Sequence, residues 1–404
     1  MEEWKEVKLG DVVNILDSKR IPLSSKQRSE RRGPYPYYGA QGIIDFIDDY
    51  LFDGEYILIA EDGENLRSKK QNIAQIAKGK YWVNNHAHII ETNEFANLKF
   101  IYHLLNAIDI SGYITGSAQP KLSQANLKAI QLKIPCIEYQ QRIASILSSL
   151  DDKIELNRRI NENLEQQAQA LFKSWFIDFE PFADGEFVDS ELGMIPKGWR
   201  VGTLTDIAVF LNGLAMQKFP PIEGEESLPV LKIKELGQKY CDKSSDRCSN
   251  KIDSKYIINN GDIIFSWSGT LLVDFWCGGK CGLNQHLFKV TAKSGYPQWL
   301  AYFWTKHHLN RFIRIAQDKA VTMGHIKRGD LDASLVLMPP TDIMNQIGKL
   351  IHPIVSSSIE RRLESARLAT LRDTLLPKLM SGELDKEVVV SKMEITTQHG
   401  AMEG

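Results

Sequence analysis

The sequence predicts an α+β protein made of two pseudo-repeated domains that are separated by two long antiparallel coiled-coil helices. Three observations lead to this fold class: an internal duplication at an offset of about 200 residues, short β-rich runs in each half, and a long amphipathic segment after each set of runs. At 404 residues the chain is long enough for two or three domains with substantial cores.

The duplication is visible from the first residues onward. Matched positions include Trp4 with Trp199, Leu9 with Leu204, Asp11 with Asp206, Asn84-Asn85-His86 with Asn284-Gln285-His286, and Pro135 with Pro339. The offset drifts by only a few residues, as loop insertions would cause. Each half therefore has the same internal order, a domain followed by a helix.

Residues 1–136 form the first predicted domain. Its expected strands are Glu55–Ala60, Tyr81–Val83, His88–Glu91 and Ile130–Ile134. Gly, Asn and Asp separate these runs, which is typical of turns, and Leu98–Ile108 has helical periodicity. The mixture indicates an α+β domain, and the repeat predicts a second one at residues 181–340.

Residues 137–180 and 341–385 are the two predicted spacer helices. Glycine is absent between Glu138 and Phe176, where apolar residues recur at helical spacing over roughly 39 residues, or about 58 Å. Since each stripe would be exposed alone, we expect the two helices to pack together; helices packed separately on their own domains are the alternative. The expected interface residues are Ile143, Leu147, Leu150, Ile154, Leu164, Leu171, Trp175, Ile347, Ile351, Leu363, Leu371 and Leu375.

Three further features qualify these helices. Asn157 and Asn161 interrupt the first stripe and are expected to fix register or orientation. Pro353 lies inside the second stripe and predicts a kink. The tail at residues 386–404 has no periodicity and is predicted to be disordered.

The composition places limits on function. With 49 basic and 51 acidic side chains the chain is nearly neutral, so any DNA contact must come from a local patch. No long apolar run or signal-like start is present, which predicts a cytoplasmic protein without membrane contact. Five cysteines indicate reduced thiols, although the spacing of Cys277 and Cys281 leaves a zinc site open as the less favoured alternative.

No catalytic, cofactor-binding or metal-binding motif is complete. Gly278-Gly279-Lys280 is followed by Cys281, which excludes a P-loop, and the Asn/Asp-Pro-Pro-aromatic motif of adenine methyltransferases is absent. Glu6-Val7-Lys8 lacks the upstream aspartate of a metal nuclease. His86 and His88 have no third ligand in sight, so they are predicted to be structural. The sequence therefore predicts a binding protein and not an enzyme.

Local basic and polar segments are the candidates for contact with double-stranded DNA. Lys19–Arg32 has only Glu30 as a counter-charge, and we expect a loop whose cations contact phosphates; a solvated loop without function is an equal alternative. Gly116–Leu122 and Thr322–Arg328 are corresponding turns that differ in sequence, which suits domains reading different targets. The candidate residues are Lys19, Arg20, Lys26, Arg28, Arg31, Arg32, Tyr37, Tyr38, Asn85, Ser117, Gln119, Lys121, Asn212, Gln217, Lys218, Thr322, Met323, His325, Lys327 and Arg328.

Several motifs resemble the specificity subunits of type I restriction-modification systems. They include YWVNNHAHII, LFKSWFIDFEPF, TMGHIKRGDL and LRDTLLPKLMSGEL, in the order domain, helix, domain, helix over residues 1 to about 385. SWFIDFEPF and LLPKLMSGEL, at the helix ends, are the most specific. The resemblance implies two target recognition domains, each binding one half of a split, asymmetric DNA sequence.

The resemblance also implies partners. Two methylation subunits would dock on the helical spacer and supply S-adenosylmethionine for adenine N6 methylation. Two restriction subunits that use ATP and Mg²⁺ would complete the nuclease, and no cofactor is expected in this chain. Two alternatives remain open: the specificity subunit of a type II-like system, and a helical scaffold that binds proteins without touching DNA.

Overall fold

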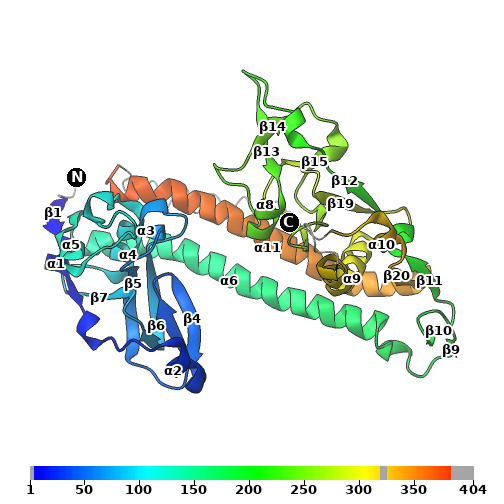
Figure 1. The fold of residues 1–404 in the computed structure, drawn as a ribbon, viewed down its shortest axis with the longest axis horizontal. Helices are drawn as coiled ribbons and strands as arrows, with labels where there is room; N and C mark the ends of the chain where they lie inside the picture. The colour runs from blue at the N-terminus through cyan, green and yellow to red at the C-terminus, as the bar shows by residue number, and fades with distance from the viewer. Residues whose placement is uncertain (1–3, 319–324, 384–404) are drawn as a thin grey trace. The chain divides into compact units, whose positions relative to one another are not determined.

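The computed structural model describes residues 4–318 and 325–383, in two units (Figure 1). Unit 1 contains the described residues up to Asp152 and those from Leu368 onward, and unit 2 contains Lys153–Arg367. Each unit thus combines one α+β domain with segments of both long helices. The predicted fold class is confirmed, and the predicted tail at residues 386–404 lies outside the described residues.

The domain of unit 1 is built on a six-stranded sheet. Its elements are β1 (Lys5–Lys8), α1 (Leu9–Val12), β2 (Val13–Ile15), η1 (Asp17–Lys19), α2 (Ser25–Glu30), β3 (Arg32–Gly39), β4 (Gly42–Ile47), β5 (Phe52–Ala60), α3 (Asn65–Ser68), β6 (Ala74–Val83), β7 (Ala87–Thr92), α4 (Leu98–Ala107), η2 (Ser111–Tyr113), α5 (Gln124–Ala129) and β8 (Gln131–Ile134). The sheet order is β2-β7-β5-β6-β3-β4, and β1 pairs separately with β8. The predicted strands and the predicted helix all fall within β5, β6, β7, β8 and α4, apart from one or two terminal residues.

The domain of unit 2 contains two four-stranded sheets and two further pairs of strands. Its elements are η3 (Glu180–Phe182), β9 (Phe187–Val188), β10 (Ile195–Pro196), β11 (Arg200–Thr203), α7 (Leu204–Ile207), β12 (Ala208–Asn212), η4 (Met216–Lys218), β13 (Ser227–Leu231), α8 (Ile233–Gln238), β14 (Arg247–Ser249), η5 (Ser254–Tyr256), β15 (Ile257–Ile258), β16 (Ile263–Ser266), β17 (Val273–Phe275), β18 (Cys281–Leu283), β19 (Leu287–Ala292), α9 (Gln298–Asp318), α10 (Arg328–Asp332) and β20 (Leu335–Met338). The sheet orders are β12-β19-β16-β17 and β14-β13-β18-β15, while β9 pairs with β10 and β11 pairs with β20.

The repeated positions have the same structural roles in both units. The Asp11 carboxylate accepts a hydrogen bond from the backbone of Lys8 at 3.0 Å, and Asp206 accepts one from Thr203 at 2.8 Å. Leu9, which follows Lys8, is fully buried, as is its counterpart Leu204. The duplication seen in the sequence is therefore also a duplication of the fold.

The long helices are α6 (Ile137–Phe176) and α11 (Thr341–Met380). The predicted starts at residues 137 and 341 agree with these bounds, and α11 continues through Pro353 without ending. Buried predicted stripe residues are Ile143, Leu147, Leu150, Ile347 and Ile351; the half-buried ones are Ile154, Leu164, Leu171, Trp175, Leu363, Leu371 and Leu375.

Within each unit the two helices contact each other in antiparallel orientation. In unit 2, the fully buried Asn157 donates its Nδ2 to Glu364 Oε2 at 2.8 Å, while the later residue Leu164 of α6 shares a small cavity with the earlier residue Val355 of α11. In unit 1, Arg372 Nη1 donates to Asp151 Oδ1 at 2.7 Å. The polar position predicted at Asn157 thus lies inside the helix contact, as expected for a residue that fixes register.

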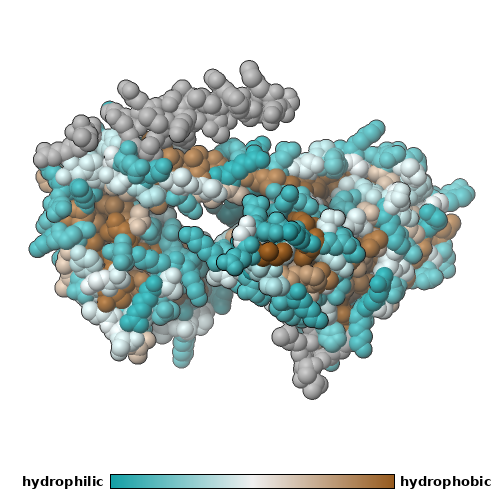
Figure 2. All heavy atoms as spheres, turned by 90° about the horizontal axis from the view of Figure 1, so that it is seen from above, coloured by the Kyte–Doolittle hydropathy of each residue, from teal (hydrophilic) through white to brown (hydrophobic). Residues whose placement is uncertain are grey.

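The surface is mixed in polarity. On the face shown in Figure 2, hydrophilic residues surround separate hydrophobic patches. Within residues 4–318 and 325–383, no helix combines the length and apolar character needed to cross a bilayer.

We predict that Arg362→Ala destabilises unit 2 strongly. Arg362 Nη1 donates to Asp274 Oδ1 at 2.7 Å, and the side chains are only 17% and 13% exposed. Removing the guanidinium leaves Asp274 with Lys239 at 3.4 Å as its remaining cation, at an expected cost of about 2–4 kcal/mol in the free energy of unfolding. Urea unfolding measures this cost.

The matched control is Arg158→Ala, on α6 in the same unit. The Arg158 side chain is 54% exposed and, among the described residues, forms ion pairs only with Glu155 and Glu162 of its own helix, so its removal should change the free energy of unfolding by about 0.5 kcal/mol or less. Equal effects of the two substitutions would contradict a stabilising role for the Arg362–Asp274 pair.

Candidate nucleic-acid interface

A short turn with the same geometry follows β6 in unit 1 and β18 in unit 2. Asn84 Oδ1 accepts a hydrogen bond from the backbone of His86 at 2.8 Å, and Asn284 Oδ1 accepts one from His286 at 3.3 Å. Both asparagines are buried, with 7% and 6% exposure. An asparagine that bonds the backbone two residues ahead holds a tight turn, so we name residues 84–86 and 284–286 the asparagine turns.

Two further segments join each asparagine turn through backbone hydrogen bonds. In unit 1, Glu61 donates its N–H to the His86 carbonyl at 2.9 Å, and its own carbonyl accepts from Leu122 at 2.8 Å. In unit 2, Trp267 donates to His286 at 3.4 Å and accepts from Ile326 at 3.1 Å. The backbones of Asp62 and Lys121 also form an isolated antiparallel β-bridge, and those of Ser268 and His325 form the equivalent one in unit 2. Three chain segments therefore meet in the same way in both units.

The side chains on this shared backbone frame differ between the units. The equivalent pairs are Glu61 and Trp267, Asp62 and Ser268, Asn85 and Gln285, and Lys121 and His325. His86 Nδ1 lies 2.7 Å from Asp62, whereas His286 Nδ1 lies 3.2 Å from the hydroxyl of Ser268. The frame is common to both units, and the chemistry that it presents is specific to each.

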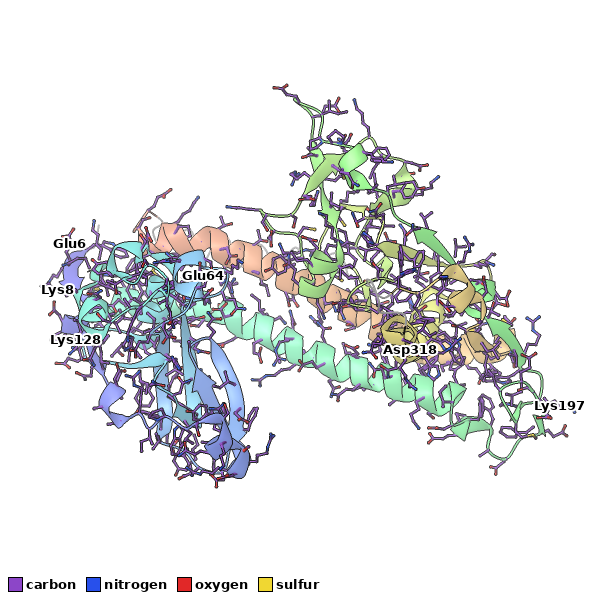
Figure 3. All side chains as sticks on the ribbon, viewed as in Figure 1. Glu6, Lys8, Glu64, Lys128, Lys197 and Asp318 are labelled. Carbon is purple, nitrogen blue, oxygen red and sulfur yellow. The ribbon has the colours of Figure 1, made fainter. Side chains whose placement is uncertain are left out.

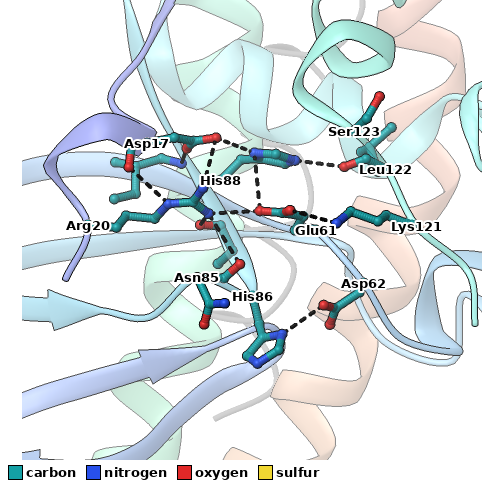
Figure 4. A network of polar contacts seen from close by, with 12 residues as sticks. Asp17, Arg20, Glu61, Asp62, Asn85, His86, His88, Lys121, Leu122 and Ser123 are labelled. Atoms are coloured by element: carbon teal, nitrogen blue, oxygen red, sulfur yellow. Dashed lines mark hydrogen bonds and ion pairs between the residues drawn. The ribbon is translucent and has the colours of Figure 1, made fainter. Parts of the chain in front are cut away.

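In unit 1 the frame is supported by a network of ion pairs behind the turn (Figure 4). The buried His88 bonds Asp17 through Nδ1 at 2.5 Å and the Leu122 carbonyl through Nε2 at 2.7 Å. Arg20 donates to Glu61 at 2.9 Å and to the Ala87 carbonyl at 2.8 Å. Burial raises the pKa of Asp17, but the hydrogen bond and charge of His88, the backbone hydrogen bond from Ile89 and the charge of Arg20 together outweigh this effect, so the pKa lies below its ordinary value.

The same network bears on metal binding at the histidines. Asp17 and Glu61 lie beside His88, which could not be predicted from the sequence. In the described part of the chain, these three residues form the one group whose potential ligand atoms lie close enough together to hold a metal ion. However, both nitrogens of His88 are hydrogen-bonded, and Arg20 and Lys121 already neutralise the carboxylates. This donor set fits a closed ion-pair network better than a metal site.

In the described ranges the other candidate metal residues do not form a group of three ligands at metal-binding spacing, although Cys281 shares a hydrogen bond with Cys241. Burial raises the pKa of Cys277 to about 11, which disfavours the thiolate that binds zinc. Glu6 and Lys8 are exposed on β1, where the strand pairs with β8 (Figure 3).

Two hollows flank the asparagine turn of unit 2. The first, of about 750 Å³, is lined by Gln285 and His286 together with Gln217, Lys232 and Arg247. The second, of about 740 Å³, has a largely apolar lining that also includes the polar, basic and aromatic side chains of Asn212, Trp267, Lys293, His325, Lys327 and Arg328. Five of the eight residues predicted for DNA contact in this unit therefore line one of these two hollows.

The basic segment of unit 1 differs from the prediction. Lys19–Arg32 is not one loop: Ser24 caps α2, and its hydroxyl accepts from the Gln27 backbone at 3.3 Å. Glu30 is not the only counter-charge, because Arg28 and Arg31 bond Asp45 and Asp48 at 3.1 and 2.9 Å. Pairing of β3 with β4 brings these aspartates beside the arginines.

The remaining cations of this segment are more accessible. Lys19 and Lys26 are exposed and have no ion pair with any residue in the described ranges, and Arg32 is exposed near Asp45. Arg20 belongs to the network behind the turn. The part of the segment available to phosphates is therefore smaller than predicted.

The predicted tyrosines are largely internal. Tyr37 is fully buried with Ile47 and Trp82, and its hydroxyl accepts from the Leu23 backbone at 2.9 Å. This placement corrects the prediction, because a side chain without exposed surface cannot stack on a base. Tyr38 is half-buried, with its ring 5.4 Å from that of Tyr81.

The other predicted residues lie at the surface or beyond the described ranges. Exposed residues are Asn85, Ser117, Gln119, Lys121, Asn212, Gln217, Lys218, His325, Lys327 and Arg328. Thr322 and Met323 lie outside the described residues. Gln285, Trp267, Lys232 and Arg247 were not predicted from the sequence; the repeat could have identified Gln285, since it aligns with Asn85.

Known proteins share both the sequence pattern and the fold. Residues 1–166 and 196–367 match the type I restriction modification DNA specificity domain. The type I restriction enzyme MjaIX specificity subunit of Methanocaldococcus jannaschii is 29% identical, with 95% of this chain and 97% of the relative covered. The HindI specificity subunit of Haemophilus influenzae is 22% identical, with 95% and 100% covered.

A solved structure has the same fold. The S subunit of a type I restriction-modification system from M. genitalium superposes with a TM-score of 0.61 at 14% identity, covering 94% of this chain and 96% of the other. Because the family match spans well over half of the sequence, in two segments that correspond to the two repeats, this chain belongs to the family of type I restriction-modification specificity subunits.

Proposed function

We propose that this chain is the DNA-recognition subunit of a type I restriction-modification complex, and that each unit reads one half of a bipartite, asymmetric target. The observation that carries the proposal is the pair of asparagine turns. Equivalent backbone frames with different side chains at equivalent positions are what two different half-sites require. Phosphate contacts from cations such as Lys26 would set register without specifying sequence.

In this proposal the two long helices set the spacing and dock two methylation subunits. A helix of 40 residues is about 60 Å long and can span roughly 17 base pairs. Two half-sites with an unread gap fall within that reach. Two restriction subunits complete the complex.

We assign the chemistry to the partner subunits. S-adenosylmethionine would be held by the methylation subunits, and ATP and Mg²⁺ by the restriction subunits. This chain then contributes recognition and positioning, and no catalysis.

Exchange of one domain tests the proposal directly. Replacing residues 1–136 with the corresponding domain of another family member should change one half-site of the methylated motif and leave the other intact. The measurement is methylation sequencing of DNA modified by the chain together with its methylation subunits. A change in both half-sites would contradict independent reading, and the absence of any sequence-selective methylation by the original complex would contradict the function.

A paired deletion tests the role of the helices. We expect removal of Lys153–Leu156 and Ala366–Ala369, one turn from each helix, to shorten the gap by about two base pairs, since four residues span about 6 Å. These segments lie between the polar positions Asp151 and Asn157 on α6 and between Glu364 and Arg372 on α11. Converting the same two segments entirely to alanine keeps the length and should keep the gap. An unchanged gap after the deletion would show that the helices do not set the spacing.

The exposed cations of unit 1 are predicted to contact phosphates. Changing Lys19, Lys26 and Arg32 to Gln should weaken binding to all DNA sequences and lower the slope of log affinity against log salt by about 1 for each phosphate no longer neutralised. The matched control replaces three exposed lysines of the β1–β8 ladder, Lys5, Lys8 and Lys133, with Gln. Fluorescence anisotropy over a salt series measures both, and identical slopes would exclude the first set from the interface.

A further inference from the structure

The asparagine turns direct very few side chains outward. In unit 1, Asn85 and His86 are exposed between the buried residues Asn84 and Ala87. In unit 2, Gln285 and His286 are half-buried between the buried residues Asn284 and Leu287. The groups that each turn can offer to a ligand are therefore one carboxamide and one imidazole.

The imidazoles are engaged with the protein, whereas the carboxamides are available. His86 bonds Asp62, and His286 bonds Ser268. Across the described ranges, the Asn85 side chain has no hydrogen-bond partner, and the Gln285 carboxamide has only a long contact of 3.4 Å with His286 Nε2. A carboxamide carries both a donor and an acceptor, so each turn presents an unused pair of hydrogen-bonding groups.

The surroundings of Gln285 suit a nucleic acid. The first hollow, which Gln285 lines, is also lined by three cations. Lys232 lies on the segment that joins β13 to α8, Lys234 lies on α8, and Arg247 lies on β14. Lys232 and Lys234 pair with Asp246 and Asp242, while Arg247 bonds Ser227. These cations are thus held in place at the rim of the hollow, where phosphates of a bound duplex could replace the aspartates.

From these contacts we infer that Asn85 and Gln285 are the equivalent base-reading residues of the two half-sites, and that each reads one A·T pair in the major groove. The inference rests on the proposed function and assigns it to two side chains. Asn and Gln form paired hydrogen bonds with N6 and N7 of adenine, a pattern that no other base offers in that groove. The buried asparagine behind each carboxamide fixes the turn, which keeps the geometry of reading rigid.

The experiment uses the full chain in complex with its methylation subunits. Methylation sequencing first defines the motif. Methylation is then measured on synthetic duplexes in which one base pair of the motif at a time is replaced by each of the other three. For Gln285→Ala we expect discrimination at one A·T pair of one half-site to fall roughly 5- to 150-fold, with every position of the other half-site unchanged. Asn85→Ala should do the same in the opposite half-site.

A second variant and a control make the test specific. Gln285→Glu keeps the shape of the side chain but removes its hydrogen-bond donor. Preference at that position should therefore move from adenine toward cytosine, because a carboxylate can accept a hydrogen bond from the N4 amino group of cytosine. Asn310→Asp, an exposed amide-to-acid change on α9, should leave the motif unchanged. Thermal unfolding of each variant checks that the fold is retained.

The outcomes separate this inference from the proposed function. A wild-type complex with a bipartite motif whose discrimination survives both alanine variants would overturn the inference and leave the function standing. A uniform decrease of methylation at all positions would also overturn it, because it would indicate positioning and not base reading. A wild-type complex without sequence preference would overturn the function itself.

Discussion

The fold depends on the burial of two apolar stripes that lie about 200 residues apart in the chain. A helix of 40 residues cannot expose such a stripe along its whole length, and burial contributes about 25 cal/mol for each Å² removed from water. Because α6 packs against α11 in both units, two segments with the second domain between them in sequence bury each other's stripes. The order domain, helix, domain, helix is the one expected from duplication of a domain-helix unit.

Polar groups lie within the helix contacts, where we expect them to define the register of the pairing. Asn157 is completely buried and bonds Glu364, although an apolar residue there would bury more hydrocarbon. A polar side chain at such a position favours one alignment because every other alignment leaves it unpaired. In the proposed function the two domains read half-sites at a fixed separation, so a defined alignment has a functional value that additional stability would not supply.

The sequence predicted those parts of the fold and of the candidate site that have a local signature. Helical periodicity located α6 and α11, and the repeat located the second domain. The counter-charges of Arg28 and Arg31 were not predictable in this way, because Asp45 and Asp48 reach them only through pairing of β3 with β4. The candidate site followed the same rule: its polar loop residues could be proposed from the sequence, whereas its frame consists of backbone hydrogen bonds between three distant segments, which place few demands on side-chain identity.

The two units support the same frame by different physical means. Unit 1 places Glu61 among Arg20, His88 and Lys121, so the support consists of ion pairs that must change together. Unit 2 has Trp267 at the equivalent position, with its ring 6.0 Å from that of His286. By contrast, the Asn85 carboxamide at the tip of unit 1 is exposed, and exposed substitutions rarely change stability by more than about 0.5 kcal/mol. In the proposed function, the residue at the exposed tip of unit 1 can therefore change without cost to the fold, whereas the ion pairs behind it would have to change as a set.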